Sequence, residues 1–121
     1  MYTALYVTRD SVAAGDDAGA PHVLELKVPG SKQPEAIIQD LLADGYLPAV
    51  ASGTATWSVA SNSLLAVVAQ EWQSPRMLRP VRGESDLDIV DGVLRLHFNY
   101  HAQQDPRSTF ETLVRIRLRA L

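Results

Sequence analysis

The stretch that decides the fold closes the chain, residues 93–121, VLRLHFNYHAQQDPRSTFETLVRIRLRAL. Apolar and polar side chains alternate over its first nine residues, which is the period of two expected of a strand with one buried face. The apolar face would consist of Leu94, Leu96, Phe98 and Tyr100, and the opposite face of Val93, Arg95, His97, Asn99 and His101. We predict a second strand over residues 110–119, with Phe110, Val114, Ile116 and Leu118 facing inward and Glu111, Leu113, Arg115, Arg117 and Arg119 facing outward. The polar residues 102–108 would join the two strands as an antiparallel hairpin.

The spacing of two histidines in this stretch argues against a metal centre. His97 and His101 are four residues apart, and on a helix both rings would reach one ion, as in an HExxH motif. In a strand, four residues span about 13 Å, whereas a metal binds each histidine at about 2 Å. The sequence therefore predicts no metal and no other cofactor, provided that residues 93–101 are extended.

The first half of the chain predicts one hairpin and one helix. Residues 2–9 are rich in β-branched and aromatic side chains, and residues 22–28 alternate, so we predict two strands joined by a flexible loop at residues 10–21. The helix is predicted within residues 29–45. Its signals are Ser31 as the N-cap, Pro34 and Glu35 in the first turn, the apolar stripe of Ile37, Ile38, Leu41 and Leu42, and Gly45 just beyond the end.

Residues 54–72, TATWSVASNSLLAVVAQEW, predict a central hairpin. A two-residue turn at Asn62–Ser63 would place Trp57 opposite Val68 and Val59 opposite Ala66. Both faces of residues 64–69 are apolar, which is typical of a strand covered on both sides. Residues 75–81 predict a short edge strand because Pro80 cannot donate to a ladder, and residues 82–92 predict an acidic turn region.

The sum is a single α+β domain over residues 1–121, with elements in the order β-β-α-β-β-β-β-β. We expect a curved antiparallel sheet of six or seven strands packed on one main helix, as a roll or half-barrel. A length of 121 residues suits one core, and 46% hydrophobic with 21% charged residues is ordinary for a folded chain.

Composition excludes several classes of function. There is no cysteine, which removes disulfides, thiolate chemistry and cysteine-based zinc sites. No apolar run approaches the ~20 residues of a membrane helix, and the start lacks the features of a signal peptide, so we predict a cytoplasmic protein. Residues 76–121 carry eight arginines against six acids, whereas residues 1–75 carry three basic residues against eight acids. This asymmetry could orient a partner.

The sequence offers three further candidate sites: a histidine with a carboxylate, a stripe of arginines, and the turn before the helix. His97 could act as a general base beside a carboxylate such as Glu71, Glu111 or Asp105, with Arg95 or Arg115 holding an anion. No nucleophile motif accompanies it, so a solvated or oligomer-facing surface is favoured. The arginine stripe of Arg95, Arg115, Arg117 and Arg119 could meet phosphates. That face lacks the aromatic side chains that stack on bases, which argues against nucleic-acid binding. Residues 28–32, VPGSK, favour a plain turn and helix cap over an anion site.

The strongest sign of a lined cavity follows the apolar strand at residues 64–69. Gln70 and Glu71 bring polar groups that need partners or water, and Trp72 is suited to a pocket or an interface. The candidate ligand-binding residues are thus Glu71, Trp72, Arg95, His97, Asn99, His101 and Arg115.

Residues 54–78, TATWSVASNSLLAVVAQEWQSPRML, carry a resemblance to a known group of proteins. The residues that carry it are Trp57, Ala66, Gln70, Trp72 and Pro75. The segment resembles one found in small uncharacterised bacterial proteins carried on mobile, integron-type gene cassettes. The resemblance implies an accessory protein of unknown role and supplies no catalytic residues.

The prediction for function is a non-enzymatic binding or interaction protein that forms a homodimer. One helix cannot cover both faces of so many apolar strands, and a second copy could cover the rest. The alternative is a small-molecule enzyme or ligand-binding protein with a pocket between the helix and the curved sheet, lined by Trp72, Glu71 and His97. Nucleic-acid binding through the arginine stripe is the third.

Overall fold

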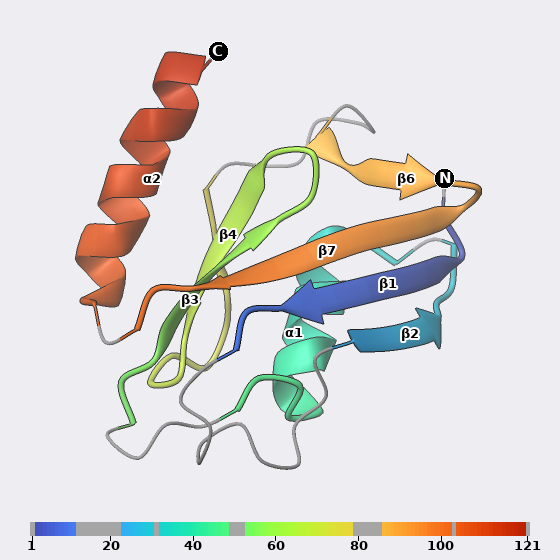
Figure 1. The fold of residues 1–121 in the computed structure, drawn as a ribbon, viewed down its shortest axis with the longest axis horizontal. Coiled ribbons are helices and arrows are strands. Elements are labelled where there is room, and N and C mark those ends of the chain that lie inside the picture. The colour runs from blue at the N-terminus through green and yellow to red at the C-terminus, as the bar shows by residue number, and fades with distance from the viewer. Residues whose placement is uncertain are drawn as a thin grey trace.

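A mixed, open sheet of seven strands and two helices make up the part of the chain that the computed structural model describes: residues 2–11, 23–30, 32–48, 53–78, 86–102 and 104–120 (Figure 1). The strands are β1 (Ala4–Arg9), β2 (Val23–Lys27), β3 (Thr56–Ala60), β4 (Leu64–Ala69), β5 (Arg76–Met77), β6 (Asp88–Val90) and β7 (Val93–Tyr100). The helices are α1 (Pro34–Ala43) and α2 (Pro106–Ala120). The strand order is β2-β1-β7-β3-β4-β5, with β6 also paired to β7.

The long strand β7 is the centre of this sheet, and its predicted alternation is confirmed. Leu94, Leu96 and Phe98 are buried on one face, while the polar residues between them lie on the other. On one side β7 pairs with β1, and on the other with β3 and β6. The pairing with β1 is parallel, so the prediction of an all-antiparallel roll is wrong. Parallel neighbours need a long connection, and nearly the whole chain lies between β1 and β7.

The last segment is the helix α2, so the predicted strand at residues 110–119 and the hairpin through residues 102–108 are both wrong. Asp105 caps this helix, because its Oδ2 accepts the Ser108 N–H at 2.9 Å. That hydrogen bond also lowers the pKa of the Asp105 carboxyl. Pro106 fills the first position of the helix, where the missing N–H costs nothing. Because α2 is a second helix, the prediction of a single main helix is also wrong.

The sheet nevertheless has seven strands, as many as predicted. The predicted strand at residues 110–119 is absent, but β6 is an additional strand that the sequence did not predict. It lies within the acidic region that the sequence predicts as a turn, and pairs Asp88 with Arg95 and Val90 with Val93. The predicted edge strand is present as β5, at the end of the strand order. Residues 79–85, including Pro80, lie outside the described residues.

Helix α1 covers the inner face of the sheet and forms as its sequence predicts. Pro34 begins it, Glu35 is in its first turn, and Gly45 follows its end with a φ of 77°. The N-cap is Gln33, without a side-chain hydrogen bond; Ser31 is outside the described residues, as is most of the loop predicted at residues 10–21. The apolar side of α1 packs into a core that includes Ile37, Ile38, Leu41, Leu5, Val7, Trp57, Val59, Leu94, Leu96 and Phe98.

The β3–β4 hairpin has the predicted register through most of its length. Trp57 lies opposite Val68 and Val59 opposite Ala66. The register shifts beside the turn, where Ala60 pairs with Leu64, so the turn is one residue longer at its start than predicted. Strand β4 is covered on both sides, as its composition indicates: Ala66 and Val68 belong to the core, and Val67 is buried on the other face, where α2 contacts β4.

The outer face of the sheet is covered unevenly. In Figure 1, α1 lies behind the sheet, whereas α2 stands at the far left beside β4. No other described element covers the outer face of β2, β1, β7 and β6. This uncovered half carries a row of polar side chains along β7 and just after it, called the polar row below: Arg95, His97, Asn99 and His101. Neither of the described helices is long and apolar enough to span a membrane.

Candidate binding site on the outer face of the sheet

His97 is the centre of the polar row on β7 and joins two strands. Its Nδ1 lies 2.7 Å from Thr8 Oγ1, and its Nε2 lies 2.9 Å from Asp10 Oδ1. An ionised carboxylate only accepts hydrogen bonds, so Nε2 carries a proton, and in the neutral ring Nδ1 accepts from the Thr8 hydroxyl. Asp10 Oδ2 accepts the Tyr100 N–H at 2.9 Å. These contacts fasten the end of β1 to the end of β7.

His101 forms a second, more buried pair at the α2 end of the row. Its Nε2 lies 2.8 Å from the Ser58 Oγ, and Asn99 Nδ2 donates to the same oxygen at 3.3 Å. Ser58 belongs to β3 and is only 1% exposed. A hydroxyl and an imidazole at this distance resemble a nucleophile and its base, but a substrate cannot reach this hydroxyl.

The environment shifts the pKa values of Asp10 and His101. Burial alone would raise the pKa of Asp10, but the Tyr100 N–H, the His97 hydrogen bond and the charges of both histidines when protonated outweigh it and lower the pKa. Burial lowers the pKa of His101, and the charge of Asp10 opposes this only in part. His101 is therefore neutral and Asp10 ionised at pH 7.

Arg95 stands at the other end of the row, beside two open grooves. Its guanidinium lies 5.6 Å from the centre of the Tyr6 ring, within the range of a cation–π contact. The first groove has about 310 Å³ and is lined by Tyr6, Thr8, Ala60, Ser61, Asp88, Arg95, Leu96 and His97. The second has about 480 Å³ and is lined by Ala4, Leu5, Tyr6, Glu25, Leu26, Lys27, Val90, Asp91, Val93 and Arg95.

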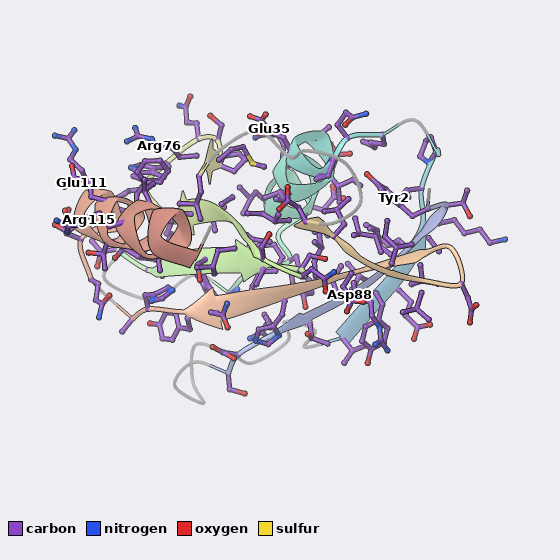
Figure 2. All side chains as sticks on the ribbon, turned by 90° about the horizontal axis from the view of Figure 1, so that it is seen from above. Tyr2, Glu35, Arg76, Asp88, Glu111 and Arg115 are labelled. Carbon is purple, nitrogen blue, oxygen red and sulfur yellow. The ribbon has the colours of Figure 1, made fainter. Side chains whose placement is uncertain are left out.

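The structure brings together four of the seven sequence-predicted site residues, Arg95, His97, Asn99 and His101. Trp72 lies elsewhere, with the Arg76 guanidinium 4.7 Å from its ring, and it lines a pocket of about 160 Å³ with core residues such as Leu42 and Trp57. Glu71 is exposed in the turn after β4. Arg115 is exposed on α2 and, with Glu111, points away from the body of the protein (Figure 2). Trp72, Glu71 and His97 therefore do not share a pocket.

The carboxylate beside His97 is Asp10, not Glu71, Glu111 or Asp105 as the sequence suggests. Thr8 and Ser58 were also missed. Thr8 lies on β1, Asp10 follows the end of β1, and Ser58 lies on β3; β1 and β3 are the neighbours of β7, and only the strand order places these residues there. Asp10 directly follows the end of β1. A polar residue just after a strand was the signal in the sequence that could have marked it as a site residue.

The hydrogen bonds around His97 occupy the ring nitrogens that acid–base catalysis would need. Both ring nitrogens of His97 are engaged, by Thr8 and by Asp10, so neither lone pair nor N–H is free for a substrate. Among the described residues, no group of three or more possible metal ligands is gathered together. The exposed guanidinium of Arg95 and the apolar side chains of the larger groove, such as Val90 and Val93, are open to a ligand.

Comparison with protein-family models, with curated proteins and with solved structures found no match to this chain. The resemblance of residues 54–78 to cassette-borne proteins thus stays a prediction. The fold and the site define an α+β protein with an open mixed sheet, and the described residues leave half of one face uncovered.

The Asp10 network predicts how stability depends on pH. The pKa of His101 is lowered on folding, so the free energy of unfolding should fall as pH drops below about 6.5. The pKa of Asp10 is also lowered, so its contribution should be present above about pH 4 and be lost below it. Asp10→Asn should lower the free energy of unfolding at pH 7 by about 1 kcal/mol, a discounted value because water screens this half-exposed carboxylate.

Urea unfolding from pH 3 to 8 measures both effects. Asp10→Asn should flatten the decline below pH 4, and His101→Gln the decline that begins near pH 6.5. Equal slopes in the wild type and both variants would contradict the assigned roles. Glu35→Gln is the control, because this exposed carboxylate is far from the network in the sequence and lies on α1.

Proposed function

We propose that this chain is a non-enzymatic interaction protein that works as a homodimer through the end of its sheet where β2 and β6 expose apolar side chains. One observation carries the proposal. The large hydrophobic side chains that are exposed among the described residues are Val23 (51%), Leu26 (40%) and Val90 (50%). Val23 of β2 and Val90 of β6 lie on the outer face, whereas Leu26 of β2, opposite Leu5, lies on the inner face at the end of the sheet. Leu26 and Val90 line the same groove of about 480 Å³. An apolar surface with a rim of charged side chains is typical of a protein–protein contact.

The polar row supports an interaction role over catalysis. His97 has both nitrogens occupied, and Ser58 is buried. The pocket between α1 and the sheet holds about 160 Å³, whereas ligand sites commonly hold about 300–1,000 Å³. The arginine stripe does not form as predicted, because Arg115 lies on α2 and Arg95 on β7, and this weakens the case for nucleic acid.

A small anion is a second candidate partner, favoured by Arg95 at the groove of about 310 Å³. A carboxylate or phosphate could pair with this guanidinium above the Tyr6 ring. Asp88 lies directly across the strands from Arg95 and opposes an anion there, which is why this candidate ranks below the homodimer.

Molar mass in solution tests the homodimer. Sedimentation equilibrium from about 1 to 200 µM should show the 13.2 kDa monomer giving way to a species of twice that mass, with a dissociation constant in the micromolar range. A constant monomer mass up to 200 µM, at low and at physiological salt, would overturn the proposal.

A further inference from the structure

The strand β2 presents a free edge. It stands at the end of the strand order, with β1 on one side and no described element on the other (Figure 1). The Val28 N–H donates to Thr3 O at 2.9 Å, so Val28 turns its backbone groups toward β1. Alternation along an antiparallel ladder then turns those of Val23, Glu25 and Lys27 outward. Their N–H and C=O groups are a template for another strand.

We infer that two copies of this chain pair antiparallel through β2, with the two-fold axis at Leu26, forming one continuous sheet. The inference rests on the proposed function and names the surface through which the homodimer forms. In this register Glu25 of each copy lies directly opposite Lys27 of the other. Each pair joins two residues with outward backbone groups, so it makes two N–H to C=O hydrogen bonds, and the two Glu25–Lys27 pairs together make four.

Charge selects this register from those that the backbone allows. An axis at Glu25 would place two carboxylates opposite each other, and an axis at Lys27 would oppose two ammonium groups, both of which destabilise a strand pair. An axis at Leu24 would leave Glu25 opposite Val23. Only the axis at Leu26 gives every charge on β2 an opposite charge across the new ladder.

The same register also covers the exposed apolar side chains of β2. Leu26, 40% exposed, meets its own copy in a pair without backbone hydrogen bonds, where side chains are closest. Leu24 faces the partner's Val28 beside it. On the other face Val23, 51% exposed, lies opposite the partner's Pro29. Proline has no N–H, but its carbonyl can still accept from the Val23 N–H.

An edge strand that is short and carries lysine and proline is often protected from pairing. In β2, Glu25 and Lys27 are two residues apart on one face. Antiparallel pairing about Leu26 therefore places each of these charges opposite one of the other sign, and the lysine does not prevent pairing. A five-residue strand makes a small interface, and small interfaces are weak. We therefore expect the dimer in the micromolar range.

Charge exchange tests the surface and its register. Glu25→Lys opposes two pairs of lysines, and Lys27→Glu opposes two pairs of glutamates, so each variant alone should dimerise at least tenfold more weakly than the wild type. Mixed one to one, the two variants should form a heterodimer, because every cross-strand pair is then opposite in sign. The double variant E25K/K27E should recover the homodimer. Glu35→Lys on α1, away from β2, is the matched control and should dimerise as the wild type does.

The outcomes separate this inference from the proposed function. Sedimentation gives the mass, and circular dichroism confirms that each variant is folded. A wild type that stays monomeric overturns both. A wild-type dimer that neither single variant weakens leaves the homodimer and removes β2 as its surface. Weakened single variants whose mixture and double variant do not recover would overturn the register at Leu26.

Discussion

Replacing Phe98 with alanine is expected to lower the free energy of unfolding by about 3–5 kcal/mol, a large share of the roughly 5–15 kcal/mol typical of a domain. Phe98 has no exposed surface and is placed in the middle of the sheet, opposite Val59 of β3 and beside Arg9 of β1. Its ring lies 5.7 Å from that of Tyr46, just after α1. Truncation would leave a cavity where β1, β3, β7 and the helix layer meet.

Urea unfolding of the variant, followed by circular dichroism, measures the loss. Phe98→Leu keeps most of the apolar volume and should cost less than about 1.5 kcal/mol. Asn99→Ala, the next residue on the outer face, should also cost much less, since it removes one long hydrogen bond to Ser58. If Phe98→Ala and Asn99→Ala were equally mild, the inner and outer faces of β7 would be wrongly assigned.

Elements defined by neighbouring residues were predictable from the sequence. The alternation in β7, the β3–β4 register and the start and end of α1 each depend on residues within about 20 positions of one another. Proline at the first helical position and glycine after the last one are local signals, and Pro34 and Gly45 occupy those positions. The same is true of the polar row from Arg95 to His101.

Contacts between distant strands were not predictable in this way. Nothing near Asp10 or His97 in the sequence indicates that β1 will run parallel to β7, because pairing of strands almost 90 residues apart depends on the whole topology. The sequence therefore identified His97 as a site residue but not Asp10, the carboxylate beside it. The bond between Thr8 and His97 has the same origin, since their pairing belongs to that parallel ladder.

The helix α2 was missed because its sequence fits two periods. Phe110 and Val114 are four residues apart, which suits one side of a helix as well as alternate positions of a strand. Thr109, Phe110, Leu113 and Val114 follow helical spacing and, with the buried Pro106, are the less exposed residues of its first half. The deciding signal was Asp105–Pro106, an N-cap followed by proline at the first position, which a strand would not need.

Glu111→Pro is expected to destabilise α2 by about 3 kcal/mol or more, because proline removes a helical hydrogen bond and its ring clashes with the preceding turn. Glu111 is exposed on the outer side of α2, so the loss comes from the backbone and not from its side chain (Figure 2). Without α2, the outer face of β4 at Val67 would meet water. Helical ellipticity at 222 nm should fall, and the midpoint of urea unfolding with it.

Glu111→Ala is the matched control, and alanine's helix propensity should leave stability within about 0.5 kcal/mol of the wild type. A local reporter is also available: Arg76 lies over the rings of both Phe110 and Trp72, so release of α2 should change tryptophan fluorescence. Proline tolerated as well as alanine would mean that residues 106–120 do not depend on a helix.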